Sequence, residues 1–205
     1  RDPKDRNKVE FKHSFKKLTD VKDIDTKDPV SYYIECDNEN YHDANILGMG
    51  LYDGTTSWYV EENMINDVFD YLKNVPKYTF DLKKNIVLLK RYDLNTIYDA
   101  NIAAYLLNKT IKDDLGLMMK QDKIEVPLYN EIIKSKEDID NIVTLKARYL
   151  YDSHDKYVND MRVQDVINLF DKVEVPLTKV LAKMEIKGIK CSKDILDEQS
   201  ENIKS

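Results

Sequence analysis

The chain has 205 residues, of which 42% are hydrophobic and 34% are charged, and its formal net charge is −6 at pH 7. This composition is typical of a folded domain and excludes a disordered or low-complexity chain. No apolar run approaches the ~18 residues that a membrane span needs, so we expect no membrane association. The acidic balance argues against tight, autonomous binding of nucleic acid, because phosphate neutralisation supplies most of the affinity of such binders.

The N-terminal half predicts an edge segment followed by an antiparallel meander. Residues 1–29 mix both charges densely and end at the turn signal Asp28-Pro29, which indicates a linker or an edge segment. Tyrosines and β-branched residues predict three successive strands, at 30–36, 46–52 and 56–60. The dipeptide Asp53-Gly54 is typical of a hairpin turn between the last two.

The middle of the chain alternates helices and strands. Apolar residues at helical spacing predict a helix over 64–72, and two further strand–helix units follow it. Their expected ranges are a strand at 78–80, a helix around 86–89, a strand at 96–98 and a helix ending at Leu107. A helical turn at 113–119, irregular structure at 120–134 and a long helix, in pieces from Ile139 to Phe170, complete the pattern. This order predicts an α/β (α+β) fold, with a mixed sheet flanked by helices.

The C-terminal stretch predicts a short amphipathic helix. Pro176 suits the first turn of a helix, where its missing N–H costs nothing. Leu177, Val180, Leu181 and Met184 then form one apolar stripe. Gly188 is expected to end the helix in a left-handed cap.

Three sequence segments resemble the bacterial DNA polymerase I family, a group of family A DNA polymerases. The run EVPLTKVLAKMEIKGIKC, Glu174 to Cys191, is similar to the family's junction between its 3′–5′ exonuclease-like domain and its polymerase domain. Tyr98 to Asn108, YDANIAAYLLN, and Glu39 to Leu51, ENYHDANILGMGL, are similar to two other family segments in the same order. The resemblance covers roughly residues 9–205.

The resemblance implies a ribonuclease-H-like sheet of the DEDD exonuclease type. It divides the chain into a charged N-terminal segment (1–29), an exonuclease-like domain (30–172) and the beginning of the polymerase domain (173–205). Active members of this class hold two divalent cations, which activate the attacking water and stabilise the leaving oxygen. Such hard cations require carboxylate ligands, so four acidic side chains must converge.

The first two acidic motifs of the family are degraded here. The strand that should carry D-x-E reads Tyr33-Ile-Glu35, and the nearest acidic pair is Glu35 with Asp37. The second motif aligns with residues 81–85, where Asn85 replaces the metal-binding aspartate. Asp81 in this segment is explained more simply as a helix N-cap, as is Asp99 further along.

The third motif, Y-x-x-x-D, aligns without gaps at residues 146–150. Lys146 then stands for the tyrosine and Leu150 for the aspartate. A literal match exists one helical turn later, at Tyr151 and Asp155, but such a short pattern is also expected by chance. The three histidines are scattered, and we expect them to be surface or hydrogen-bonded residues: His13, His42 and His154.

Three readings follow. In the first, the chain is a fragment of a DNA polymerase I whose exonuclease domain is inactive, with Glu35, Asn85 and Leu150 at the degenerate positions and no cofactor of its own. It then serves as a structural base for the polymerase domain of the same chain, and Mg²⁺ and DNA are bound by the parent enzyme. The second reading is an active exonuclease with relocated ligands, and the third is a DNA-binding module that does not cut. The relocated set would be Glu35, Asp37, Asp81 and Asp155, with Tyr151.

The resemblance also sets expectations for the cell biology. We expect a monomer in the bacterial cytoplasm that reaches the nucleoid through DNA. Cys36 and Cys191 lie far apart in the sequence and are expected to be reduced thiols.

Overall fold

A mixed six-stranded sheet forms the centre of the molecule. The computed structural model describes residues 13–204. The strand order is β1-β4-β3-β2-β5-β6. The strands are β1 (Lys16–Lys17), β2 (Val30–Cys36), β3 (Ile46–Tyr52), β4 (Ser57–Val60), β5 (Lys77–Thr79) and β6 (Thr96–Asp99). β2, β3 and β4 form an antiparallel meander, whereas β5 and β6 continue the sheet in parallel with β2.

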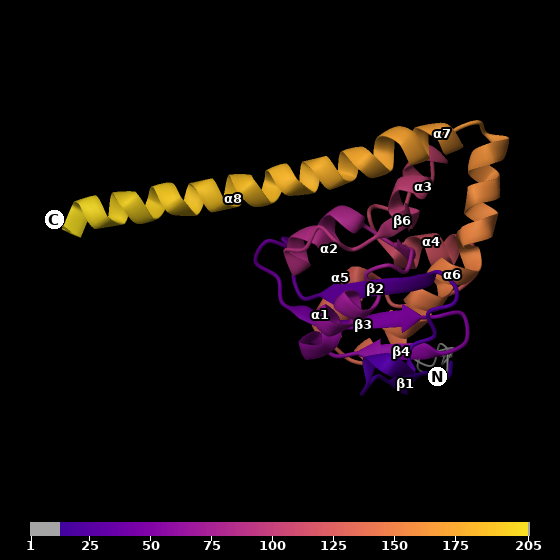
Figure 1. The fold of residues 1–205 in the computed structure, drawn as a ribbon. Coiled ribbons are helices and arrows are strands. Elements are labelled where there is room, and N and C mark those ends of the chain that lie inside the picture. The colour runs from indigo at the N-terminus through magenta and orange to yellow at the C-terminus, as the bar shows by residue number, and fades with distance from the viewer. Residues whose placement is uncertain (1–12, 205) are drawn as a thin grey trace, which may run out of the picture.

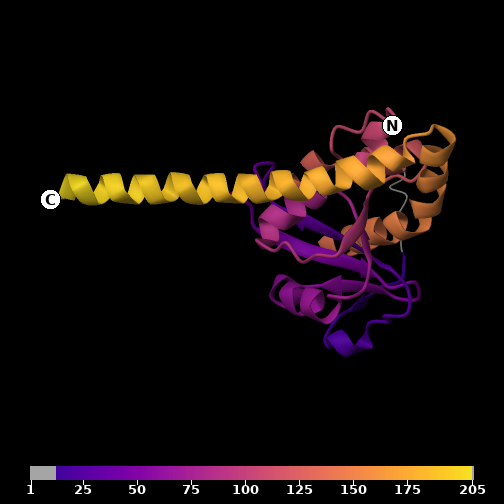
Figure 2. The same cartoon turned by 45° about the horizontal axis from the view of Figure 1, so that its top comes forward.

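Helices cover both faces of this sheet and connect its parallel strands (Figure 1). The α-helices are α1 (Glu62–Tyr71), α2 (Leu82–Leu89), α3 (Ala100–Leu106), α4 (Leu115–Gln121), α5 (Tyr129–Ser135), α6 (Ile139–Val163), α7 (Ile167–Leu169) and α8 (Val175–Lys204). A 3₁₀ turn, η1 (Val21–Asp23), precedes the sheet, and a π-helical segment, η2 (Phe170–Glu174), leads into α8. α8 runs along the body beside α2 and then extends beyond it (Figure 2).

β2 separates two hydrophobic cores, because its side chains alternate between the two faces of the sheet. Tyr32 and Ile34 belong to the core beneath α1 and α2, whereas Tyr33 belongs to the core beneath α3, α4 and α6. Every residue of β2 is buried, as expected of a strand with neighbours on both sides and helices on both faces. Ser31 shares the face of Tyr33, and its hydroxyl donates to the Ala147 carbonyl of α6 over 2.5 Å.

α6 crosses the sheet at unusually close range over β3. A Cβ atom built on Gly50 would lie only 2.0 Å from the Val143 carbonyl oxygen of α6. Only a residue without a side chain permits this contact, because real Cβ atoms do not approach backbone so closely. Gly50 therefore determines how near α6 comes to the sheet.

The structure corrects two local predictions. Residues 129–134, which fall in the stretch expected to be irregular, lie in α5, where the Glu131 carboxylate accepts a hydrogen bond from the Leu128 N–H over 2.8 Å. Only Ile132 of this short helix is buried, so the sequence carries almost no periodic signal for it. Gly188 does not end a helix, since α8 continues through it to Lys204. A single glycine costs a helix only about 1 kcal/mol, which the helix formers around it offset.

The remaining local predictions lie close to the observed elements. The strands predicted at 30–36 and 46–52 match β2 and β3, and α6 begins at Ile139 as expected. The predicted edge segment contains β1, which pairs in parallel with β4, whereas residues 1–12 and the side chain of Cys191 lie outside the described part. Cys36 is a buried free thiol. Among the described residues no helix combines the length and the apolarity that a bilayer crossing requires.

Candidate functional site at the carboxyl edge of the sheet

Two aspartates organise the edge where the parallel strands β2, β5 and β6 end. Asp99 closes β6, and its carboxylate accepts hydrogen bonds from the backbone N–H groups of Asp81 (2.9 Å), Leu82 (2.8 Å) and Asn101 (2.9 Å). Burial raises the pKa of Asp99 to about 6, and the neighbouring charge of Asp81 adds to this effect. Asp81 caps α2 by accepting from the Lys84 N–H over 3.3 Å. Both N-cap predictions are thus confirmed.

A buried ion pair lies on the β2 face that packs against α6. The Lys146 ammonium lies 3.5 Å from a carboxylate oxygen of Glu35, and neither side chain has any exposed surface. At this distance the contact is an ion pair rather than a short hydrogen bond. Two opposite charges in a water-free interior are tolerated only when they neutralise each other. Lys146 therefore supplies the positive charge that Glu35 requires.

Tyr33 completes this cluster by filling the space beside the ion pair. Its hydroxyl accepts a hydrogen bond from the Lys146 ammonium over 3.4 Å, and the same ammonium lies 4.7 Å from the centre of its ring. The pKa of Tyr33 is raised well above its usual value, first by burial and then by the negative charges of Glu35 and Asp114. Lys146 is thus held between the Glu35 carboxylate and the face of the Tyr33 ring.

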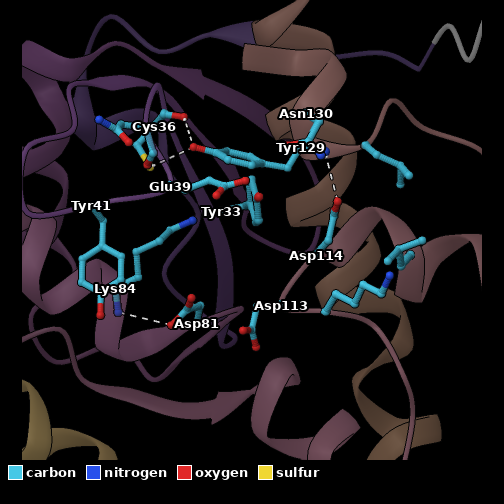
Figure 3. Close-up of a pocket in the computed structure, with 14 residues that line it drawn as sticks. Tyr33, Cys36, Glu39, Tyr41, Asp81, Lys84, Asp113, Asp114, Tyr129 and Asn130 are labelled. Atoms are coloured by element: carbon cyan, nitrogen blue, oxygen red, sulfur yellow. Dashed lines mark hydrogen bonds between the residues drawn. The ribbon is translucent and has the colours of Figure 1, made fainter. Parts of the chain in front are cut away.

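A cavity of about 600 Å³ lies at this edge of the sheet, and Tyr33 is the member of the cluster that lines it (Figure 3). Tyr33 and Cys36 from β2 contribute to one wall, and Asp81 and Lys84 from the start of α2 contribute to another. Tyr129 of α5 is fixed at the rim, because its N–H donates to Asp114 (3.0 Å) and its hydroxyl to the Cys36 carbonyl (3.2 Å). The other lining residues are Asn38, Glu39, Tyr41, Lys112, Asp113, Asp114, Leu117, Leu128 and Asn130. The carboxyl ends of parallel strands are where open α/β sheets bind ligands.

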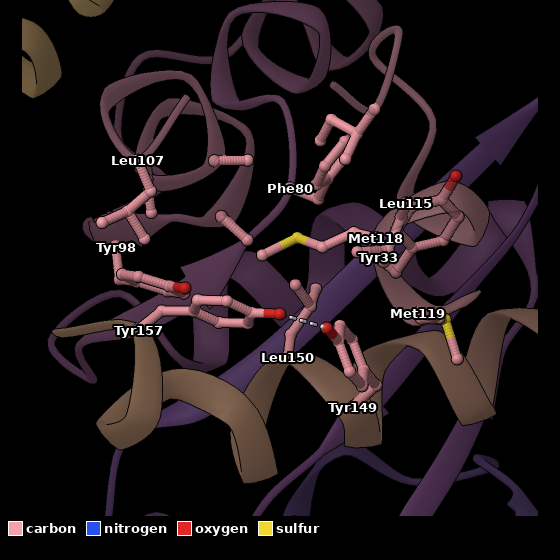
Figure 4. Close-up of a cluster of buried hydrophobic side chains, with 14 of the residues drawn as sticks. Tyr33, Phe80, Tyr98, Leu107, Leu115, Met118, Met119, Tyr149, Leu150 and Tyr157 are labelled. Carbon is pink, nitrogen blue, oxygen red and sulfur yellow. Dashed lines mark hydrogen bonds between the residues drawn. The ribbon is translucent and has the colours of Figure 1, made fainter. Parts of the chain in front are cut away.

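The other two positions predicted to be degenerate, Asn85 and Leu150, hold neutral, buried side chains. The Asn85 amide donates to the Thr79 hydroxyl over 3.0 Å and is almost fully buried. Leu150 has no exposed surface and packs in the core of α3, α4 and α6, next to Tyr149 and Tyr157 (Figure 4). Neither residue can supply a negatively charged metal ligand at this edge.

Of the four relocated carboxylates, Asp37 and Asp155 are engaged elsewhere. Asp37 closes the β2–β3 loop by accepting from the Asn45 backbone N–H (2.8 Å) and side-chain amide (3.2 Å). The side chain of Asp155 is 99% exposed and lies 2.8 Å from His154, whose ring stacks on Tyr78 at 3.9 Å. These two carboxylates therefore do not converge with Glu35.

Tyr151 lies at the other end of the strands, near the amino end of β2. Its ring packs edge-to-face on Tyr52, 5.0 Å away, at the carboxyl end of β3. Because β3 is antiparallel to β2, this end lies away from the cavity. Within residues 13–204, no group of three or more histidine, cysteine, aspartate or glutamate side chains is placed to hold a metal ion.

The sequence alignment places Lys146 at the tyrosine position of the third motif but does not predict its ion pair with Glu35. Ile142, Val143, Ala147 and Leu150 are buried on one face of α6, and Lys146 is buried among them. A lysine in an apolar stripe requires a buried acidic partner, and this signal was available. The partner could not be identified, because the pairing depends on how α6 crosses β2.

The expected surface or hydrogen-bonded roles of the histidines agree with the structure. His13 contacts the Thr144 hydroxyl at 2.7 Å, and His42 contacts Glu185 at 2.6 Å. His154 lies beside Asp155, as described above.

Comparison with known proteins identifies the family of this chain. Residues 32–137, just over half of the chain, match the family described as "DNA polymerase I, ribonuclease H-like domain". A DNA polymerase I of Bacillus subtilis (strain 168) is 25% identical over 92% of this chain, which spans 23% of that relative. The chain therefore corresponds to only about a quarter of the relative's length.

Two solved structures share the fold. The POL domain of Pol1 from M. smegmatis, in complex with DNA primer-template and dNTP, has a TM-score of 0.61 at 17% identity over 78% of this chain and 29% of its own. Escherichia coli RNase D, an exoribonuclease, has a TM-score of 0.60 at 10% identity over 79% of this chain and 46% of its own. At these identities the similarity establishes the ribonuclease-H-like fold alone. By its sequence match and its fold, the chain belongs to the family of ribonuclease-H-like, 3′–5′ exonuclease-like domains of bacterial DNA polymerase I.

Proposed function

We propose that this chain is a non-catalytic 3′–5′ exonuclease-like domain that serves as a structural base for the polymerase part of a bacterial DNA polymerase I. The Glu35–Lys146 ion pair is the observation that carries the proposal. It puts a fixed ammonium, 3.5 Å from the carboxylate, where the aligned motifs of an active exonuclease would bring metal ligands together.

The residues at the aligned positions do not fit a two-metal site. Such a site needs several carboxylates around each pair of cations. Here the corresponding positions hold Tyr33, Asn85 and Leu150 beside the single carboxylate of Glu35. A divalent cation next to Glu35 would also be repelled by Lys146, which cannot move to solvent without leaving its carboxylate unpaired. No hydrolytic step through a metal is therefore assigned to this domain.

In this proposal the beginning of α8 belongs to the polymerase part. Its outward face is apolar and exposed, which suits contact with a following domain: Leu177, Val180, Leu181 and Met184. Its inward face is anchored on the body through Val175 and Ala182, which are both buried. Segment 173–205 then connects the two parts of the enzyme, and DNA and Mg²⁺ are bound by the parent polymerase. The same proposal places the parent enzyme in the bacterial cytoplasm as a monomer.

An exonuclease assay tests the proposal directly. The chain is incubated with a 3′-labelled single-stranded oligonucleotide in Mg²⁺ or Mn²⁺, with and without a chelator. We expect no metal-dependent shortening, even at high protein concentration. Shortening that the chelator abolishes would contradict the proposal, and the variants Asp81→Ala and Asp155→Ala would then show whether relocated carboxylates carry it.

A further inference from the structure

Glu185 of α8 makes several polar contacts with side chains of the domain body. α8 packs along α2, with Ala182 fully buried beneath it and Ile186 partly buried at the same interface. Glu185 lies between these two apolar residues in the sequence and is only partly exposed. Its carboxylate therefore faces the body rather than open solvent.

Three side chains from two different elements converge on this carboxylate. The His42 ring nitrogen Nε2 lies 2.6 Å from one oxygen, and the Tyr41 hydroxyl donates to the same oxygen over 3.1 Å. The Lys83 ammonium of α2 lies 3.4 Å from the other oxygen. His42 and Tyr41 belong to the loop between β2 and β3, so Glu185 ties both this loop and α2 to α8.

The contact is electrostatically favourable in its charged form. Partial burial would raise the pKa of Glu185, but the hydrogen bond from His42 and the charge of Lys83 outweigh burial, and the pKa is lowered. The pKa of Lys83 is raised, since Tyr41 and Glu185 outweigh the opposing effect of burial. Burial raises the pKa of Tyr41. Glu185 and Lys83 therefore keep opposite charges across the contact between α8 and α2.

We propose that Glu185 is a latch that holds α8 against the exonuclease-like body. One carboxylate of α8 is bound from the β2–β3 loop by His42 and Tyr41 and from α2 by Lys83, so the latch fixes α8 to two separate parts of the body. Tyr41 also lines the cavity at the carboxyl edge, so the latch shares one residue with that cavity. The proposal stands whether or not the cavity has a catalytic role.

Hydrogen exchange of the whole chain tests the latch. Protection factors for residues 177–187 are measured near neutral pH for the unsubstituted chain and for each variant. Glu185→Gln should lower this protection about two- to five-fold, the range expected for a partly exposed ion pair. Glu198→Gln is the matched control, because Glu198 is exposed on the same helix. It should leave the protection of 177–187 unchanged.

His42→Ala tests the contact from the loop side of the latch, because it removes the side chain whose Nε2 lies 2.6 Å from the Glu185 carboxylate. We expect it to lower the protection of residues 177–187, in the same direction as Glu185→Gln. Unchanged protection of β2 and β3 verifies that each variant is folded. The latch is overturned if Glu185→Gln and Glu198→Gln have equal effects. The role of His42 is overturned if His42→Ala leaves the protection of residues 177–187 unchanged.

Discussion

Lys146 shows at the scale of one residue how a buried charge is tolerated. Its ammonium has no exposed surface, yet it contacts both the Glu35 carboxylate and the Tyr33 ring. Replacing either partner alone leaves the other charge buried without a counter-charge. This lowers the free energy of unfolding by more than the intact pair contributes to it. The pair is therefore expected to behave as a unit in mutagenesis.

Lys146→Met should lower the free energy of unfolding by about 3–5 kcal/mol, because Glu35 is left unpaired. The double variant Glu35→Gln/Lys146→Met should recover most of this loss. Urea unfolding of the single and double variants measures both values. Equal losses in the two variants would contradict the pairing of these side chains.

Lys77 is a second buried lysine, and its environment predicts a pH dependence. Its ammonium donates to the carbonyls of Leu72 (2.5 Å) and Val75 (2.8 Å) and has no exposed surface. Burial lowers its pKa from 10.5 to about 8. Between these two values the unfolded chain binds more protons than the folded one, so the contribution of Lys77 to stability rises with pH.

The free energy of unfolding, relative to that of Lys77→Met, should therefore rise by roughly 3 kcal/mol from about pH 8 to above pH 10. Taking the difference cancels the titration of the tyrosines, which is common to both proteins. Chemical unfolding at a series of pH values gives the result. A difference that is flat or falling across this range would show that the Lys77 pKa is not lowered.

At the scale of elements, the sequence predicts what is local and misses what depends on tertiary contacts. β2 and β3 are predicted to the residue, because both runs are bounded by turn signals, and β2 is also rich in tyrosine and β-branched residues. α5 is missed, since its cap at Glu131 and its contact with Asp114 are invisible as a periodic pattern. For the site, alignment with the family motifs predicts which positions to inspect, but the position of Lys146 beside Glu35 follows from the path of α6 across the sheet.

That path depends on Gly50. Gly50→Ala should destabilise the domain by at least about 3 kcal/mol, because the new methyl group would meet the Val143 backbone at 2.0 Å and neither element can yield easily. Gly188→Ala is the matched control, since a Cβ atom there meets no atom within 4 Å. It should be neutral or stabilising, as alanine favours a helix. Thermal unfolding distinguishes the two, and equal effects would contradict the close approach.

At the scale of the whole molecule, the charge balance predicts weak contact with nucleic acid. The net charge is −6, and the cavity contains Glu39, Asp81, Asp113 and Asp114 but only two lysines, Lys84 and Lys112. These carboxylates would repel the phosphate backbone of a nucleic acid that approached the cavity. This distribution argues against the DNA-binding module as a separate function of the domain.

We accordingly expect a single-stranded oligonucleotide to bind with a Kd no tighter than about 10⁻⁶ M at physiological salt. The variant Glu39→Lys, which reverses one charge on the exposed loop at the cavity, should bind more tightly and with a steeper dependence on salt. Fluorescence anisotropy at several salt concentrations measures both. Tight, steeply salt-dependent binding by the unsubstituted chain would instead support a DNA-binding role.

Because Glu35 is neutralised by Lys146, the folding of this region does not depend on the concentration of free metal ions in the cell. In a metalloprotein, part of the native structure is complete only after a metal has been captured, so folding competes with every other consumer of that metal. Here the counter-charge to Glu35 is synthesised with the chain as Lys146. The charge balance around Glu35 is thus complete without a captured cation, and this region can reach its final structure when divalent cations are scarce.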